Sequence, residues 1–106
     1  MKITVTFVKG GLARYVSHLD WVRFVYRALR RTGLPFAITQ GFTPRPRVAF
    51  GRALKVGQEG NAAATFEFRE PVRVEEVRQR FAAHVMVGVT IQDVTYGTEN
   101  DSGKHG

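Results

Sequence analysis

The chain has 106 residues, with 16 Lys and Arg against 9 Asp and Glu, a formal net charge of +7 and no cysteine. This length suits one domain, and the lack of cysteine excludes a disulfide framework, a cysteine-based zinc site and a cysteine-ligated iron–sulfur cluster. No apolar run approaches the roughly 20 residues that span a bilayer, so we expect a cytoplasmic protein with no membrane partner.

The first half of the chain predicts a strand and then a helix. Residues 2–7 alternate polar and apolar side chains, which is typical of a half-buried strand. Ser17 fits a helix N-cap with Asp20 in the first turn, and Gly33 fits the left-handed residue that follows the last turn. We assign the apolar stripe of this helix to Leu19, Val22, Tyr26 and Leu29, and a basic stripe to Arg23, Arg27, Arg30 and Arg31.

Short strands and glycine-rich connections follow this helix. Residues 36–39 and 47–50 are predicted to be short strands on either side of a loop, and residues 51–60 a flexible loop or irregular hairpin. Alternating apolar residues predict another half-buried strand over residues 62–68.

A second helix and a last strand complete the predicted domain. The helix follows Pro71 and places Val74, Val77 and Phe81 on its inner face. A last strand begins at residue 89 and runs to about residue 96, and a shift in its apolar phase indicates either a bulge or a two-faced edge.

This order of elements predicts one α+β domain over residues 1–96. It is the ferredoxin-like split βαβ pattern, with an antiparallel sheet, two helices on one face and an elaborated central hairpin. Residues 97–106 are expected to be a disordered polar tail. The second face of the sheet would be open, and open sheet faces of this fold often bind RNA.

The segment from Gln40 to Arg47 is the first candidate binding site. Gly41 permits a sharp turn, and the prolines on either side of Arg45 hold it extended. Two guanidinium groups on a stiff backbone suit an anion such as phosphate. The alternative is an ordinary connection whose arginines are solvated. Phe42 is either a stacking platform for a base or a plug that anchors the loop in the core, and we favour the plug.

The distribution of charge indicates the class of partner. Residues 1–60 carry 11 Lys and Arg against 2 acids, whereas residues 61–106 carry 5 against 7. This asymmetry favours a polyanion, meaning nucleic acid or an acidic protein face, and the alternative is a basic surface with no dedicated ligand. We therefore expect RNA as the partner, bound at Arg14, Arg23, Arg27, Arg30, Arg31, Gln40, Phe42, Arg45 and Arg47, with Lys9 at the rim.

Catalytic and metal sites have weaker support in the sequence. His18, beside the helix start, is a candidate general base for attack by an RNA 2′-hydroxyl, although its alternative role is packing at the helix start. The three histidines are too scattered to suggest a metal site, and no phosphate-cradling motif occurs. We expect no metal, no cofactor and no catalytic residue, with His18 the one exception to test.

Two motifs together resemble a known family. They are Ser17–Asp20 with Arg27–Pro35, and Gln40–Arg47. They are similar to the signature of the radical-SAM-linked domain family, which has no established function, although that pattern usually has Asn at position 43 and His or Lys at position 45. The chain resembles the N-terminal half of that family's domain.

The resemblance implies two kinds of partner. Members of that family occur alone, attached to B12-binding radical SAM proteins, or beside or fused to ribonuclease E/G-type proteins. This association implies RNA- or ribosome-related work, or service as an adaptor to a radical SAM enzyme. No radical SAM chemistry can reside in this chain, because the cluster of that chemistry needs cysteines.

The sequence therefore predicts a non-catalytic RNA-binding module. The alternatives are an adaptor whose basic face docks an acidic patch on a partner protein, and a metal-independent ribonuclease that uses His18.

Overall fold

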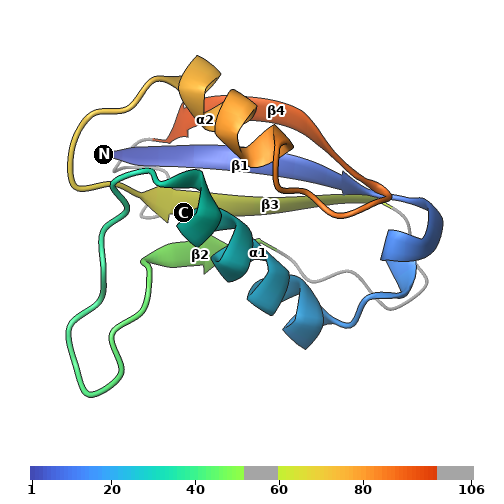
Figure 1. The fold of residues 1–106 in the computed structure, drawn as a ribbon, viewed down its shortest axis with the longest axis horizontal. Coiled ribbons are helices and arrows are strands. Elements are labelled where there is room, and N and C mark those ends of the chain that lie inside the picture. The colour runs from blue at the N-terminus through green and yellow to red at the C-terminus, as the bar shows by residue number, and fades with distance from the viewer. Residues whose placement is uncertain (52–59, 98–106) are drawn as a thin grey trace.

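A computed structural model of the chain describes residues 1–51 and 60–97. Four strands and two helices alternate as the split βαβ pattern predicts (Figure 1). The elements are β1 (Lys2–Lys9), a short 3-10 helix η1 (Gly11–Tyr15), α1 (His18–Thr32), β2 (Val48–Phe50), β3 (Gly60–Glu67), α2 (Val74–Ala82) and β4 (Val89–Gly97).

The sheet has the strand order β2-β3-β1-β4, and every neighbouring pair is antiparallel. Both helices cross the same face of this sheet, and the described residues place no helix on the other face (Figure 1). The predicted ferredoxin-like α+β fold is therefore confirmed. Within residues 1–51 and 60–97, neither helix is long and apolar enough to cross a membrane.

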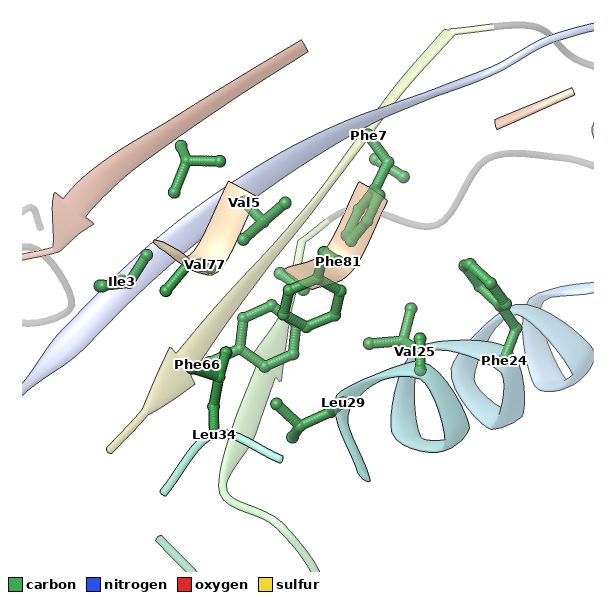
Figure 2. Packing of buried hydrophobic residues seen from close by; sticks show 14 of the residues in the cluster. Ile3, Val5, Phe7, Phe24, Val25, Leu29, Leu34, Phe66, Val77 and Phe81 are labelled. Atoms are coloured by element: carbon green, nitrogen blue, oxygen red, sulfur yellow. The ribbon is translucent and has the colours of Figure 1, made fainter. Parts of the chain in front are cut away.

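Alternation along β1 and β3 builds the core between sheet and helices. Ile3, Val5 and Phe7 are buried and face the helices, while the residues between them are half-buried on the opposite face. The ring of Phe81 from α2 lies 5.0 Å from that of Phe66 and 6.0 Å from that of Phe7 (Figure 2). These aromatic contacts join α2 to both central strands.

The two ends of α1 are fixed by the predicted signals. The side chain of Ser17 accepts a hydrogen bond from the backbone N–H of Asp20 at 3.1 Å, and Gly33 is left-handed with φ 73°. The N-cap bond satisfies one of the amides that a helix start leaves unpaired. Glycine suits the left-handed position because a Cβ would be strained there.

The predicted apolar stripe of α1 is wrong in its rotation about the helix axis. Leu19 is 58% exposed, and Tyr26 is only half-buried. The large aromatic side chains of Trp21 and Phe24 decide the buried face, because each ring removes more apolar area from water than Leu19 or Val22 would. The buried residues of α1 are Trp21, Phe24, Val25, Ala28, Leu29 and Thr32.

Residues 36–47 form a narrow hairpin instead of the predicted strand at residues 36–39. Only isolated bridges occur there, between Phe36 and Phe68 and between Ile38 and Pro46. Two backbone bonds flank the Ile38–Pro46 bridge, from the Thr39 N–H to the Arg45 carbonyl at 2.8 Å and from the Arg47 N–H to the Ala37 carbonyl at 2.9 Å. Pro46, which has no N–H, thus occupies a non-hydrogen-bonded position of this short pairing. The hairpin projects from the β2 edge of the sheet (Figure 1).

The last strand contains the predicted bulge. Opposite β1, the register passes from Phe7–Ile91 to Thr6–Asp93, so one additional residue of β4 is accommodated. The bulge turns Val94 toward the core, and its backbone N–H bonds the Asp93 carboxylate at 2.9 Å. Gly97, predicted to begin the disordered tail, is the last residue of β4 and pairs with Lys2, and Gly60, predicted to lie in a loop, begins β3. The rest of the predicted loop at residues 52–59 and of the predicted tail at residues 98–106 lies outside the described part of the chain.

Candidate nucleic-acid interface

The outward side of α1 carries a row of exposed arginines. Arg23, Arg27 and Arg30 lie opposite the buried stripe of the helix, and Arg31 flanks them. A spacing of three and four residues places successive members about one helical turn apart. The structure therefore brings the four predicted helix arginines together, and we call this row the α1 stripe.

The charge of the α1 stripe is almost unopposed. Its one ion pair joins Arg23 to Asp20 at 3.7 Å, and both side chains are exposed, so the pair contributes little. In the described part of the chain, the side chains of Arg27, Arg30 and Arg31 make no hydrogen bond or ion pair. These guanidinium groups keep their donors available for a ligand.

The hairpin of residues 36–47 presents an aromatic ring at its tip. Its loop is closed by two bonds: the Thr39 N–H donates to the Arg45 carbonyl at 2.8 Å, and the Arg45 N–H donates to the Thr39 hydroxyl at 3.2 Å. Gly41 turns the chain with φ 144°. The side chain of Phe42 is fully exposed, so the predicted plug in the core is wrong. These two hydrogen bonds between Thr39 and Arg45 stabilise the loop without a contact from the Phe42 side chain to the core.

Arg47 lies on the other side of the sheet from the α1 stripe. Phe50 faces α1, where its ring contacts that of Tyr26 at 5.8 Å, and Val48 packs against the core. Because side chains alternate along a strand, Ala49 and Arg47 face the side without helices. Arg47 indeed borders a hollow there with Lys2 and Glu67. Contrary to the prediction, Arg47 therefore does not share one continuous surface with the α1 stripe.

The face without helices differs from an aromatic RNA-binding sheet. Its middle is formed by small side chains of the strands, among them Thr4, Thr6, Ala63 and Thr65. None of the strand residues described on this face is aromatic. Base stacking, on which sheet-based single-strand recognition depends, has no platform there.

The prediction that Lys9 lies at the rim of the binding surface is wrong, because Lys9 is buried. Its residue is only 2% exposed, and its ammonium lies 5.0 Å from the centre of the Trp21 ring. Burial lowers the pKa of Lys9 because the charged form loses water. Lys9 faces the helices for the same reason as Phe7: both occupy odd positions of β1.

Arg14 and His18 have local partners near the start of α1. Arg14 lies over the ring of Tyr15 and donates to its hydroxyl at 2.9 Å. The ring of His18 meets the ring of Phe50 edge-on at 6.4 Å. These contacts give both side chains a packing role, and the proposed general-base role of His18 stays a prediction.

The described residues contain no group of three or more acidic, histidine or cysteine side chains arranged to hold a metal ion. Gln40 is exposed beside the hairpin tip and Arg45 is exposed at its closing pair.

Sequence reasoning missed Lys2, Ala49, Thr65 and Glu67, which border the hollow near Arg47. Period-two alternation in residues 2–7, 47–50 and 62–68 shows which residues of each strand share a face, but the strand register that brings these four together has no local signal in the sequence.

Comparison with known proteins identifies a family. The family described as "Uncharacterized protein conserved in bacteria (DUF2344)" matches residues 2–104 of the chain. No curated protein and no solved structure matches it.

Proposed function

Because the chain belongs to the DUF2344 family, whose description gives no activity, we propose its function from its surface: it binds RNA without catalysis. The proposed contacts are the α1 stripe and the tip of the hairpin at residues 36–47. Arg47 is left out of this surface, because it faces the opposite side of the sheet. A cytoplasmic location is part of the proposal.

One observation carries this proposal: among the residues that the structure describes, Arg27, Arg30 and Arg31 of the α1 stripe have no acidic partner. An arginine row that served only solubility would be expected among acids of similar number, as on the surface of α2. On α2, Arg80 pairs with Glu76 at 3.0 Å, and Arg78 approaches Asp93 at 3.9 Å. Phosphate groups would supply the missing anions, and arginine binds them with two parallel hydrogen bonds.

The hairpin tip supports RNA over a purely electrostatic ligand. An exposed phenylalanine has no structural reason to lie in water, and base stacking on such a ring contributes about 1–3 kcal/mol per base. Arg45 and Gln40 lie beside Phe42 in the loop and would supply phosphate and base contacts. The tip would thus hold an unpaired base while the α1 stripe neutralises the backbone.

The test is a titration of labelled single-stranded RNA, followed by fluorescence anisotropy at about 50 and 200 mM salt. Four phosphate contacts predict a loss of affinity of about 50-fold between these conditions. Replacing Arg27 and Arg30 by Ala should lower affinity and reduce the slope of log K against log salt by about 1.4. The matched control replaces Arg73 and Arg78, which are exposed near α2, and should leave the slope unchanged. An RNA affinity that does not change with salt concentration would refute the α1 stripe as the binding surface.

The second candidate function is an adaptor that docks a partner protein, and one observation favours it. Leu12 is 80% exposed and Val87 92% exposed, in segments tied together by the hydrogen bond from Gly10 N–H to the Gly88 carbonyl. Two apolar side chains so placed suit a protein contact. The resemblance to the radical-SAM-linked family makes a radical SAM enzyme or a ribonuclease E/G-type protein the partner to test. An adaptor complex would survive nuclease treatment in a pull-down, whereas an RNA-mediated one would be lost.

A further inference from the structure

A small hollow lies on the sheet face opposite the helices, away from the α1 stripe. Its volume is about 90 Å³, and its lining residues come from three strands and the approach to one of them. Cavities of about 150 Å³ accommodate a benzene-sized molecule, so this hollow has room for a phosphate group and the edge of an adjoining group. It is lined by Lys2, Arg47, Ala49, Thr65 and Glu67.

The strand register explains why three charged side chains meet there. Lys2 is the direct partner of Glu67 in the pairing of β1 with β3. On the other side, the Glu67 N–H donates to the Arg47 carbonyl at 3.1 Å, which sets Arg47 beside the same glutamate. Directly opposed residues on a sheet lie about 5 Å apart, so the side chains form a row of positive, negative and positive charge.

The floor of the hollow comes from the next row of the sheet. Thr65 pairs with Ala49 in the register of β2 with β3, and the methyl group of Ala49 leaves the space open. The Thr65 hydroxyl lies 2.8 Å from that of Thr4. Since a hydroxyl has one donor and two acceptor positions, Thr65 retains capacity for a ligand atom above it.

The charges surround the hollow and do not close it. In the described part of the chain, Glu67 forms no ion pair with Lys2 or Arg47, although both lie beside it. A row of this kind would ordinarily be a set of cross-strand ion pairs, each worth a fraction of a kcal/mol. Here the two cations remain available for an anion, and the carboxylate remains available as an acceptor.

We infer that this hollow binds one RNA phosphate together with the neighbouring 2′-hydroxyl group. Lys2 and Arg47 contact the phosphate oxygens, and Glu67 accepts the hydrogen of the hydroxyl. A bare phosphate would use the two cations but would be repelled by Glu67, whereas a phosphate with an adjoining hydroxyl satisfies all three groups. The 2′-hydroxyl is the group that distinguishes RNA from DNA, so the hollow would select RNA.

This inference takes its ligand class from the proposed function but uses a separate surface. RNA bound at the α1 stripe would reach the hollow only by passing around the β2 edge, where the hairpin at residues 36–47 projects (Figure 1). The hollow can therefore be tested with a mononucleotide, which is too small to engage both surfaces. Failure of one test leaves the other result unaffected.

The test compares adenosine 3′-monophosphate with its 2′-deoxy analogue, by chemical-shift titration of the ¹⁵N-labelled protein. In the first ligand the 2′-hydroxyl adjoins the phosphate, and in the second it is missing. The wild-type protein should bind the ribonucleotide with shifts at the amides of Ala49 and Thr65, and bind the deoxynucleotide at least fivefold more weakly. Equal affinity for the two ligands, or no saturable shift at these amides, would overturn the inference.

Three variants separate the roles of the lining residues. Glu67→Leu should abolish the preference for the ribonucleotide, because leucine has no acceptor for the 2′-hydroxyl. The same variant should bind inorganic phosphate more tightly than the wild type, because the repulsion is removed. Arg47→Ala should lower the affinity for both nucleotides at least fivefold. Ala49→Met should block the hollow while keeping every charge. Arg78→Ala, on α2 and therefore on the helix-covered side of the sheet, is the control and should change neither affinity. A Glu67→Leu variant that retains the ribonucleotide preference would show that Glu67 does not recognise the hydroxyl.

Discussion

The guanidinium of Arg80 in α2 donates a hydrogen bond to the Thr32 carbonyl at 2.7 Å, at the C-terminal end of α1. Carbonyls at this end of a helix lack partners within the helix and carry its negative partial charge. Arg80 thus caps α1 from the neighbouring helix, and Glu76 holds it in place with an ion pair at 3.0 Å.

Replacing Arg80 by Ala is expected to lower the free energy of unfolding by about 1–2 kcal/mol, because a charged donor is lost from the carbonyl of Thr32. Urea denaturation measures this value. The control is Arg78→Ala, which removes only an exposed contact with Asp93 at 3.9 Å and should cost less than about 0.5 kcal/mol. Equal losses in the two variants would show that the cap contributes nothing beyond surface charge.

The burial of Lys9 makes stability depend on pH in the alkaline range. The pKa of Lys9 is lowered in the folded protein because burial disfavours its charged form. The unfolded chain therefore keeps this proton to higher pH than the native chain, so stability rises as the pH approaches the ordinary lysine value of about 10.4. Below the lowered pKa, the full cost of burying the ammonium is present.

Lys9→Met tests this dependence, since methionine keeps an unbranched chain beneath Trp21 and carries no charge. We expect the wild type to gain stability relative to this variant between pH 7 and 10, as measured by urea denaturation at both values. Taking the difference between the two proteins cancels the titration of all other groups. A difference that stays constant over this range would contradict the lowered pKa.

The exposed ring of Phe42 allows binding to be separated from stability. Because its side chain contacts water and not the core, Phe42→Ala should change the free energy of unfolding by less than about 0.5 kcal/mol. The same variant should weaken the binding of single-stranded RNA by about 1–3 kcal/mol, because a stacking contact is lost. The slope of log K against log salt should not change, because no phosphate contact is lost. Phe42→Trp is the conservative control and should retain the affinity. RNA affinity that is unchanged in Phe42→Ala would remove the hairpin tip from the proposed surface.

Local signals in the sequence predicted both helices and the strands of the sheet, but not the hairpin in place of a strand at residues 36–39, and tertiary packing decided the buried faces. The caps at Ser17 and Gly33 act over three or four residues, so they could be predicted directly. The apolar face of helix α1 was predicted at the wrong rotation because Leu19 and Val22 repeat with the same period as the buried residues. Only the larger rings of Trp21 and Phe24 distinguish the two faces.

The candidate site was predicted in part. The α1 stripe follows from helical spacing alone, so its four arginines were grouped correctly. The separation of Arg47 from them depends on which face of β2 meets α1, and that is settled by the contact of Phe50 with Tyr26. The hollow needs the register of β1 with β3, which brings Lys2 beside Glu67 across 65 positions of the chain, and no local pattern contains that pairing.

Gly88 is predicted to be the least replaceable glycine among those described. Its φ of 91° is unfavourable for any side chain, and a Cβ there would lie 2.6 Å from the Gly10 carbonyl oxygen and 3.1 Å from the Cβ of Ala13. The neighbouring oxygen is backbone, fixed by the hydrogen bond between Gly10 and Gly88, so it cannot rotate away. Gly88→Ala should therefore lower the free energy of unfolding by about 2–4 kcal/mol. Gly11→Ala is the matched control: its φ is also positive, at 54°, but a Cβ there meets nothing within 4 Å, so the expected cost is about 1 kcal/mol. Thermal or urea unfolding measures both values, and equal costs would show that backbone conformation alone, without the close approach to Gly10, decides the choice of glycine.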